Sequence, residues 1–390
     1  MPSMNRRTFL AAGASVVAAS PVLAQTGAKK YRACIIGDLG NGAYGHSMHL
    51  AFALRDDVEV VGLADPSEDG RKRAGEEAGA VRTYADYREM LATEKPDLVA
   101  VGPRTTVNHR DYVLACAEAG AHGYLEKPLA VDLADADAMA AAVKAKNLKW
   151  AMAYNMRVAP VLAHVKKMMW DEKLIGTIYE VRGRGKEDHR AGAEDLIVLG
   201  THIFDAMVYL MGKPAWCQAD ITHNGKPARP ENVREASEPL GPIVGNRLHA
   251  MFGFATGTAG HFSSMFSRDG GGGRWGLTIH GSKGVIEVKM EVVPEAWWLD
   301  ESRWTAAHGK AWQPLPGMPD FTVTDERRER HKYIVDDLIA SIEADREPQT
   351  SLVEAVTVQE MIQGVFASHV RGARIDIPQE PREHPLKHWA

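Results

Sequence analysis

The sequence predicts an α/β protein in which a doubly wound domain over residues 31–150 precedes an α+β domain over residues 151–378. From Tyr31 onward, short runs of β-branched residues alternate with helical stretches, which is the pattern of repeated β-α-β units. Past Trp150 this alternation stops and strand-like segments follow one another. The second domain is therefore expected to hold a large, mainly antiparallel open sheet.

The first 24 residues are predicted to be an export signal rather than part of the fold. Arg6 and Arg7 precede a short run of small and apolar residues, and Val22-Leu23-Ala24 has the form of a cleavage site. This resembles a twin-arginine signal peptide. The alternative, a membrane anchor, needs about twenty strongly apolar residues, whereas this run is shorter and rich in Ala, Gly and Ser. We expect export to the periplasm by the twin-arginine machinery, which carries proteins that have already folded.

Composition excludes several partners. The net charge of -5 provides no basic excess, so nucleic acid and anionic membranes are not expected to bind. Cys34, Cys116 and Cys217 lie far apart without metal-ligand spacing, and we interpret them as buried free thiols. No metal site is expected.

The predicted elements of the first domain follow in order. Strands are expected at 32–36, 58–64, 97–101 and 122–125, and helices at 47–55, 71–78, 83–94 and 109–119. The second domain is expected to begin with a strand at 150–154, a helix at 160–171, a strand at 176–181 and a helix at 197–211. Strands at 248–254, 258–264, 275–280 and 285–290 then form the sheet, with a turn at 281–284, and helices at 326–345 and 351–370 end the fold.

A glycine-rich loop follows the first strand directly. Gly40, Gly42 and Gly45 match the spacing G-x-G-x-x-G, while Gly37 sits immediately after the strand, so the loop is a few residues longer than usual. Such glycines allow a tight turn and close approach of a pyrophosphate, which a following helix N-terminus stabilises. The loop therefore predicts a dinucleotide-binding Rossmann domain.

Asp65 supports the same interpretation. It ends the second strand twenty residues after Gly45, where an acid accepts hydrogen bonds from the adenosine ribose and repels a 2′-phosphate. NAD is thus favoured, although Arg71 and Arg73 follow closely enough to keep NADP open. The alternative role of Asp65 is a turn residue before Pro66.

Several ordered motifs resemble one enzyme family. Glu126-Lys127-Pro128 follows the last predicted Rossmann strand, and Arg157, Gly200-Thr201-His202 and the turn at 281–284 come later in the chain. In this order they resemble the Gfo/Idh/MocA family, which includes glucose-fructose oxidoreductase and inositol dehydrogenase. The resemblance covers nearly all of residues 31–378.

The resemblance implies that Lys127 and His202 flank the reacting alcohol beside a nicotinamide. Lys127 would hydrogen-bond the substrate oxygen, and His202 would take the hydroxyl proton as hydride leaves the carbon. The family commonly has an aspartate one helical turn before this histidine, but here that position is Val198. The implied cofactor-binding residues are Gly37, Leu39, Gly40, Gly42, Gly45, Asp65, Pro103, His109, Glu126, Lys127 and Arg157.

Polar residues around the histidine helix are candidates for substrate binding. The run from Gly183 to Arg190 is either a solvated face or a recognition loop for a polyol. Asp195 is seven residues before His202, too far for a direct hydrogen bond along one helix, but Glu194 or Asp195 could reach into the pocket if the helix begins after them. Asp205, three residues after His202, either contacts it or serves as a helix-packing or cap partner. The candidate substrate residues are Lys186, Asp188, His189, Asp195 and Asp205.

Two further features have more than one interpretation. The run from Gly270 to Gly273, with Arg274 and Trp275, is either a flap or a long hairpin loop. Trp297, Trp298 and Trp304 either stack on sugar rings or pack in the core or an interface.

We therefore expect an oxidoreductase that transfers hydride between a sugar or polyol and a tightly bound NAD or NADP, in a homodimer or homotetramer. One alternative is a glycosidase that oxidises its substrate transiently and eliminates a glycosidic bond. Another is a sugar- or cofactor-binding protein without activity. Lys127 favours the oxidoreductase, because relatives that act as glycosidases usually replace this lysine.

Overall fold

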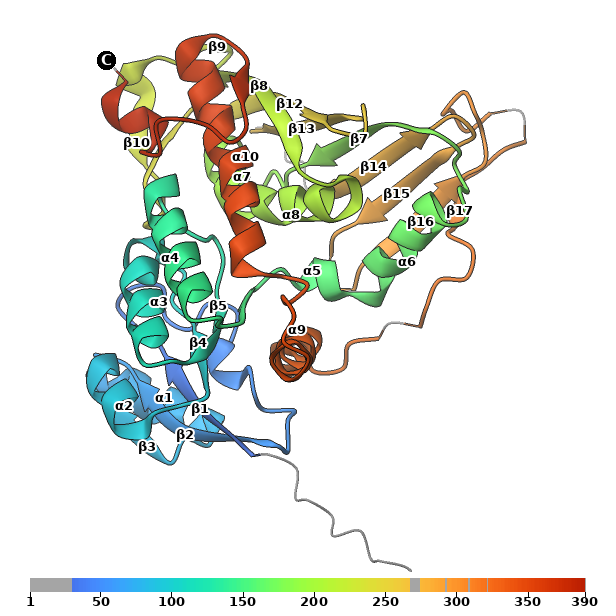
Figure 1. Ribbon diagram of the computed structural model, residues 1–390. Coiled ribbons are helices and arrows are strands. Elements are labelled where there is room, and N and C mark those ends of the chain that lie inside the picture. The colour runs from blue at the N-terminus through green and yellow to red at the C-terminus, as the bar shows by residue number, and fades with distance from the viewer. Residues whose placement is uncertain (1–29, 267–273, 292, 308, 321, 390) are drawn as a thin grey trace, which may run out of the picture.

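The protein folds into two domains that pack against each other (Figure 1). The computed structural model describes residues 30–266, 274–291, 293–307, 309–320 and 322–389. The predicted export signal at 1–24 and the run from Gly270 to Gly273 lie outside the described residues. No helix in the described part is both long and apolar enough to cross a bilayer.

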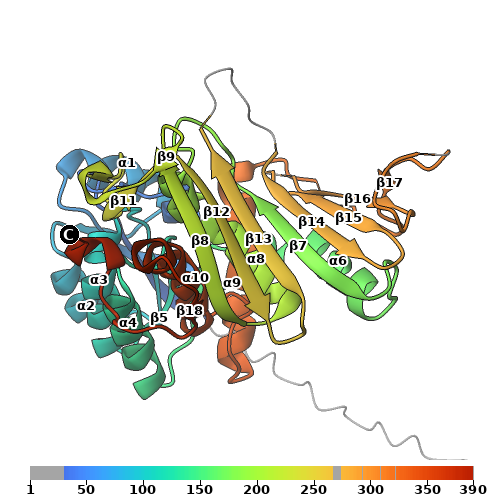
Figure 2. The same cartoon turned by 90° about the horizontal axis from the view of Figure 1, so that it is seen from above.

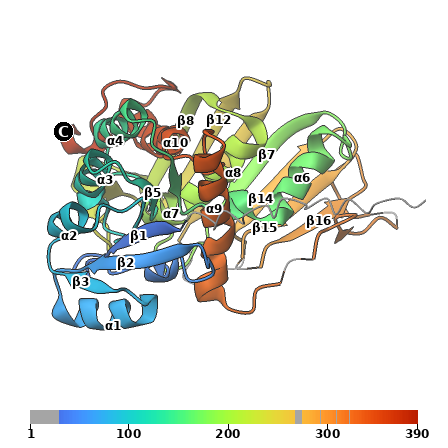
Figure 3. The same ribbon diagram turned by 60° about the horizontal axis from the view of Figure 1, so that its bottom comes forward.

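The first domain is the predicted Rossmann fold. Its described strands form one parallel sheet of six in the order β3-β2-β1-β4-β5-β6, with helices on both faces (Figure 3). The strand order reverses between β1 and β4, and ligands of such sheets bind outside the carboxyl ends of the strands at that point. The strands are β1 Tyr31–Ile36, β2 Val58–Ala64, β3 Arg82–Tyr84, β4 Leu98–Val101, β5 His122–Leu125 and β6 Trp150–Met152, and the helices are α1 Glu68–Ala78, α2 Tyr87–Glu94, α3 His109–Glu118 and α4 Leu133–Ala145.

The prediction of a helix over 47–55 was wrong. After the glycine loop the chain makes successive turns around one short 3-10 helix, η1 (Met48–Leu50). Gly45 and Ser47 both adopt left-handed φ angles, 51° and 69°, and this interrupts a regular α-helix at its start. The expected contribution of a helix N-terminus to pyrophosphate binding is therefore absent from this loop.

Two other predicted helices begin or divide differently. The helix predicted from residue 83 begins only after Asp86, whose carboxylate accepts from the Arg88 N–H, because Arg82–Tyr84 pairs with β2 as strand β3. The helix predicted over 197–211 is split at Leu199 into α7 (Ala193–Val198) and α8 (Gly200–Met211). His202 consequently lies in the first turn of α8.

The second domain has the predicted open sheet, which is antiparallel except where β7 pairs with β13. Its order in the described residues is β17-β16-β15-β14-β7-β13-β12-β8-β18, with β9 pairing with β8. Helices α6 and α8 lie on one face, and the other face is left open (Figure 2). The strands are β7 Ile178–Arg184, β8 Pro214–His223, β9 Lys226–Pro227, β12 Arg247–Phe254, β13 Ala259–Met265, β14 Gly276–Gly281, β15 Val285–Lys289, β16 Glu295–Leu299, β17 Gln313–Pro314 and β18 Ile375–Asp376, and the helices here are α5 Asn155–Val158 and α6 Pro160–Trp170.

A hairpin arm leaves this sheet between β8 and β12. It contains η3 (Pro230–Asn232) and the paired strands β10 (Val233–Glu235) and β11 (Pro242–Val244). Glu238 in the arm lies 3.7 Å from Arg104 of the first domain and 3.4 Å from Arg190 of the second. The arm thus bridges the two domains beside the loop that follows β4.

The two long helices near the C-terminus pack between the two domains, and we call this contact region the seam. α9 (Glu326–Glu343) packs on η1, β5 and β6 of the first domain, and α10 (Leu352–Arg371) packs between α4 of the first domain and α8 and β8 of the second. The three cysteines are buried and free, as predicted.

The tail after β18 returns to the first domain and ends in η4 (Pro385–His388). Arg382 binds Asp137 of α4 at 2.7 and 2.8 Å and also contacts Glu360 of α10, while its carbonyl accepts the N–H groups of Leu133 and Ala134. One arginine therefore connects both domains with the tail.

We predict that Arg382→Met lowers the stability of the fold by about 1–3 kcal/mol, because Glu360 is buried and loses its cationic partner. The midpoint of thermal unfolding, followed by circular dichroism, should fall by several degrees. Lys144→Met on the exposed side of α4 is the control and should leave the midpoint unchanged. An unchanged midpoint for Arg382→Met would show that the tail does not stabilise the seam.

Candidate functional site

A cavity of about 640 Å³ opens where the end of β5 meets the second domain. Lys127 lies just after β5, His202 enters from α8, and Trp275 precedes β14. His46 from the glycine loop and Arg330 from α9 also line it. The structure thus brings the two predicted catalytic side chains into one cavity.

Lys127 is buried in the seam between the domains. Its Nζ donates to the carbonyl of Val198 at 3.1 Å, at the end of α7. Burial lowers the pKa of Lys127 below its ordinary value, although the carboxylates of Glu126 and Glu238 oppose the shift. The lower pKa makes proton loss from the amine less costly, and Nζ can hydrogen-bond to a substrate oxygen.

His202 is held by aromatic rings instead of an acid. Tyr154 and Trp275 approach its ring edge-on, with centroids 6.0 and 5.9 Å away. Its Nδ1 is buried and has no hydrogen-bond partner in the described part of the chain. Burial, and next the charge of Lys127, hold the pKa of His202 well below its ordinary value of 6.5. The imidazole is therefore neutral at pH 7 and ready to accept a proton.

Glu126 supplies a permanent negative charge at the cavity wall. One carboxylate oxygen contacts His46 Nδ1, and the other is buried without a partner among the described residues. Burial raises the pKa of Glu126, but the charges of His46 and Lys127 and the hydrogen bond with His46 outweigh it and bring the pKa to about 2. A buried unpaired carboxylate oxygen fits a cationic ring placed against it.

The glycine loop is fixed by its approach to neighbouring backbone. A Cβ on Gly42, whose φ is 87°, would lie 2.5 Å from the N of Arg104 and 2.7 Å from the N of Thr105. Thr105 Oγ1, Thr106 Oγ1 and Arg104 Nε are buried there and lack hydrogen-bond partners in the described chain. Unsatisfied donors beside a glycine loop fit the ribose and phosphate oxygens of a dinucleotide.

Asp65 has a more local role in this structure than predicted. Its buried carboxylate accepts the N–H of Leu39 at 3.1 Å and the N–H of Ser67 at 2.8 Å. Gly37 lies under the ring of Tyr44, since a Cβ there would fall 2.1 Å from the ring. Ribose binding by Asp65 stays a prediction, and it requires the contact with Leu39 to give way.

Arg157 and Asp205 are bonded to each other and do not line the cavity. Arg157 forms ion pairs at 2.7 Å with both Asp205 and Glu354, and it donates to the carbonyl of Gln349. It thereby links α5, α8 and α10. Asp205 is thus engaged away from His202, which leaves no described acid to orient that histidine.

His109 also has a positioning role. Its ring nitrogens contact the carbonyls of Pro103 at 2.7 Å and Leu129 at 3.1 Å. It joins the loop after β4 to the loop that follows Lys127. These contacts place Pro103 and Lys127 relative to each other.

The polar run before α7 is not a solvated face. Asp195 is buried and accepts the hydroxyl of Ser264 at 2.6 Å and the N–H groups of Glu187 and Lys186 at 3.1 and 3.3 Å. This holds Lys186 at the cavity wall.

Asp188 and His189, the other two candidate substrate residues from the run between Gly183 and Arg190, do not line the cavity. Asp188 binds Arg190 at 2.6 Å, and His189 is exposed. Trp297, Trp298 and Trp304 lie on or after β16, outside the cavity lining, and Trp304 donates to the carbonyl of Gly281 at 2.8 Å. The tryptophan next to His202 is Trp275.

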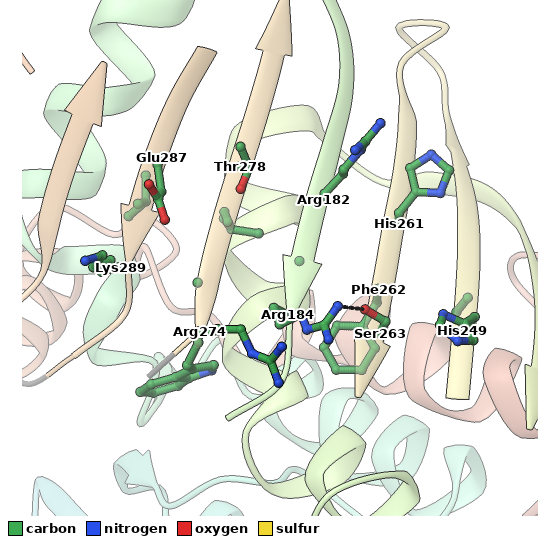
Figure 4. A pocket seen from close by; sticks show the side chains of 16 residues that line it. Arg182, Arg184, His249, His261, Phe262, Ser263, Arg274, Thr278, Glu287 and Lys289 are labelled. Atoms are coloured by element: carbon green, nitrogen blue, oxygen red, sulfur yellow. Dashed lines mark hydrogen bonds between the residues drawn. The ribbon is translucent and has the colours of Figure 1, made fainter. Parts of the chain in front are cut away.

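A second hollow of about 330 Å³ lies on the open face of the sheet (Figure 4). Trp275 contributes to both cavities. The polar side chains of this hollow are mainly basic, and they come from β7, β12, β13 and β15 and from the residue before Trp275: Arg182, Arg184, His249, His261, Arg274 and Lys289.

Sequence reasoning missed His46, Tyr154 and the residues of α9. His331 of α9 contacts the carbonyl of His46 at 3.1 Å and the hydroxyl of Tyr124 at 3.0 Å, which ties the glycine loop to β5. For His46, the available signal was its position next to Gly45. The helix itself was predicted, but nothing local in the sequence marks α9 as part of the cavity, because it reaches the cavity only through tertiary packing.

Both domains match family models. Residues 32–154 match the model described as "Oxidoreductase family, NAD-binding Rossmann fold", known as GFO_IDH_MocA. Residues 179–377 match "Oxidoreductase family, C-terminal alpha/beta domain".

Curated relatives are dehydrogenases of sugars and polyols. Levoglucosan dehydrogenase of Pseudarthrobacter phenanthrenivorans is 28% identical over 290 residues, which cover 66% of this chain and 73% of that enzyme. D-apiose dehydrogenase of Paraburkholderia graminis is 30% identical over 56% of this chain and 58% of its own length. Myo-inositol 2-dehydrogenase of Thermotoga maritima is 27% identical over 46% and 55%. The alignments with the latter two span little more than half of those enzymes.

Solved structures share the fold. A levoglucosan dehydrogenase in complex with NADH and levoglucosan superposes with a TM-score of 0.72 at 22% identity, covering 90% of this chain and 100% of that one. An NAD-binding oxidoreductase from Klebsiella pneumoniae gives 0.72 at 19% identity and covers 89% and 99%. At these identities the likeness establishes the architecture.

The ion pair between Arg157 and Asp205 gives a prediction that separates structure from cofactor binding. Arg157→Met leaves a buried, unpaired Asp205 and should destabilise the fold by about 3–5 kcal/mol in urea unfolding. Replacing both partners, as Arg157→Met with Asp205→Leu, should recover most of that stability and leave cofactor affinity unchanged. Recovered stability with lost cofactor binding would instead place Arg157 at the cofactor.

Proposed function

The chain belongs to the Gfo/Idh/MocA oxidoreductase family, and from this premise we propose that it transfers hydride between a sugar or polyol carbon and a tightly held NAD or NADP. The observation that carries this proposal is the shared cavity of Lys127 and His202 beside the glycine loop. Dehydrogenation of levoglucosan, D-apiose and myo-inositol by the named relatives supports a polyhydroxylated substrate.

Lys127 and His202 have different roles toward the substrate alcohol. A bound nicotinamide supplies the hydride acceptor. Lys127, whose pKa is lowered by burial, hydrogen-bonds the substrate oxygen and fixes the carbinol carbon. His202 takes the hydroxyl proton on an imidazole nitrogen, and this proton transfer is favourable because the charge that develops lies near the carboxylate of Glu126. In the reverse direction His202 returns the proton.

Retention of the cofactor is supported by the hairpin arm. Glu238 pairs with Arg104, whose backbone lies against Gly42 of the glycine loop, and with Arg190 of the second domain, so the arm joins the two domains beside that loop. Retention also suits the export signal proposed for residues 1–24, since a protein exported in the folded state would carry a cofactor loaded in the cytoplasm. We place the mature protein in the periplasm, as a homodimer or homotetramer. Fractionation of cells after osmotic shock tests the location, and light scattering tests the oligomeric state.

The activity test uses absorbance at 340 nm. Purified protein with NAD⁺ or NADP⁺ should reduce the cofactor when sugars and polyols are added, and Lys127→Ala and His202→Ala should each lose about 10²–10⁴-fold in kcat while still binding cofactor. Lys144→Ala and His388→Ala are matched surface controls and should keep full activity. Undiminished turnover in either cavity variant refutes the assignment. Release of an aglycone without net reduction of cofactor would favour a glycosidase.

The pH dependence follows from the neutral histidine. A base is active above its pKa, and burial and Lys127 place the pKa of His202 well below 6.5. We predict that kcat/KM for alcohol oxidation stays level from pH 8 down past 6.5 and falls only in more acidic buffer. A loss of activity with a midpoint at or above pH 6.5 contradicts this environment for His202.

A further inference from the structure

Trp275 and Lys186 form a wall of the cavity next to His202. The ring of Trp275 meets the imidazole edge-on at 5.9 Å and an interplanar angle of 74°. The ammonium of Lys186 lies 6.0 Å from the Trp275 ring centroid. Both side chains line the cavity that contains Lys127. The ammonium lies over the ring, so the two side chains together present an aromatic group and a cation to the cavity.

Two buried carboxylates hold this wall in place. Asp195 fixes the backbone of Lys186 through the hydrogen bonds described above. Glu187 is buried with a left-handed φ of 59°, and its carboxylate accepts the N–H of Met265 at 3.0 Å and binds Arg274 at 2.6 Å. Since Arg274 directly precedes Trp275, the two acids fix Lys186 and Trp275 relative to His202. The wall is therefore a rigid part of the site.

The ammonium of Lys186 is not neutralised by the protein. No acid of the described residues lies within ion-pair distance of it, Glu291 of the same cavity included. The other acids of the lining are engaged, because Glu126 contacts His46, Glu326 contacts Arg330 and Glu329 accepts from Thr324 and Asp325.

The charges that hold the wall balance one another by formal count. Glu187 is shared by Arg184 and Arg274, and Asp195 is the second acid of the group, so Lys186 remains as the cation in excess. The hollow on the open sheet face is lined mainly by basic side chains, and Glu287 is the acid that lines it in the described chain (Figure 4). In addition, Trp275 Nε1 is a buried donor without an acceptor in the described residues. The wall thus offers an unpaired cation and a free N–H to whatever occupies the cavity.

We propose that the substrate is a sugar acid whose ring stacks on Trp275 and whose carboxylate binds Lys186, while its reacting alcohol lies between Lys127 and His202. This inference rests on the proposed oxidoreductase function. The carbinol hydride goes to the nicotinamide and the hydroxyl proton to His202, which leaves a ketone, and the carboxylate is unchanged. A charged carboxylate pairs with the ammonium more strongly than a neutral hydroxyl does, so an acid is favoured over the corresponding neutral sugar.

The test compares matched glycosides that differ only in this group. Methyl β-D-glucuronide and methyl β-D-glucoside, and the corresponding galacturonide and galactoside, are assayed at 340 nm with wild-type protein and titrated calorimetrically. The uronides should have the lower KM and Kd. Lys186→Met should raise both constants for the uronides about 10- to 100-fold, the effect of losing one hydrogen bond between charged groups, and leave those of the glucoside and galactoside unchanged.

Two control variants make the result specific. Lys186→Arg retains the charge and should recover most of the uronide affinity, which distinguishes lost contact from misfolding. Lys144→Met removes the same net charge from the exposed side of α4 and should leave the uronide constants unchanged. Equal affinity of wild-type protein for acid and neutral sugar, or an equal effect of Lys186→Met on both, overturns the inference while the oxidoreductase function stands. If no sugar reduces cofactor, the proposed function fails, and the calorimetric comparison still decides whether Lys186 selects an acid.

Discussion

The hydrogen bond from Lys127 to the carbonyl of Val198 is the contact on which the site depends. It crosses from the end of a Rossmann strand to the end of α7 and so joins the two domains. Burial at this junction is the main cause that lowers the pKa of both Lys127 and His202, and the charge of Lys127 lowers that of His202 further. His202 is thereby kept neutral and can accept the proton of an alcohol.

Val198 also explains how the site works without the aspartate common at this position. The backbone there orients Lys127, and the imidazole of His202 is held between the rings of Tyr154 and Trp275. The negative charge of the site comes instead from Glu126, on the opposite side and attached to the glycine loop through His46. Cofactor loop, lysine and histidine are thus coupled by one carboxylate that belongs to the Rossmann domain.

Periodicity and contiguous motifs predicted the doubly wound sheet of the first domain, the open sheet of the second, and Lys127 and His202 as candidate site residues. Prediction failed where tertiary contacts determine the conformation of a short stretch. Ser47 takes a left-handed conformation that no helical pattern reveals, and residues 82–84 become a strand because β2 offers them an edge. The roles of Asp195 and Asp205 were open from sequence because each acid finds its partner, Ser264 or Arg157, far along the chain. Trp275 and α9 reach the cavity only through packing of the whole second domain.

The neutral form of His202 is the central claim, and nuclear magnetic resonance tests it most directly. Imidazole nitrogen shifts of protein labelled with ¹⁵N-histidine, assigned by comparison with His202→Gln, are followed from pH 8 to pH 5. The account predicts that the His202 signals stay those of a neutral ring below pH 6.5. Protonation of His202 at or above pH 6.5 would contradict it, because the ring would then carry a charge before any substrate proton arrives.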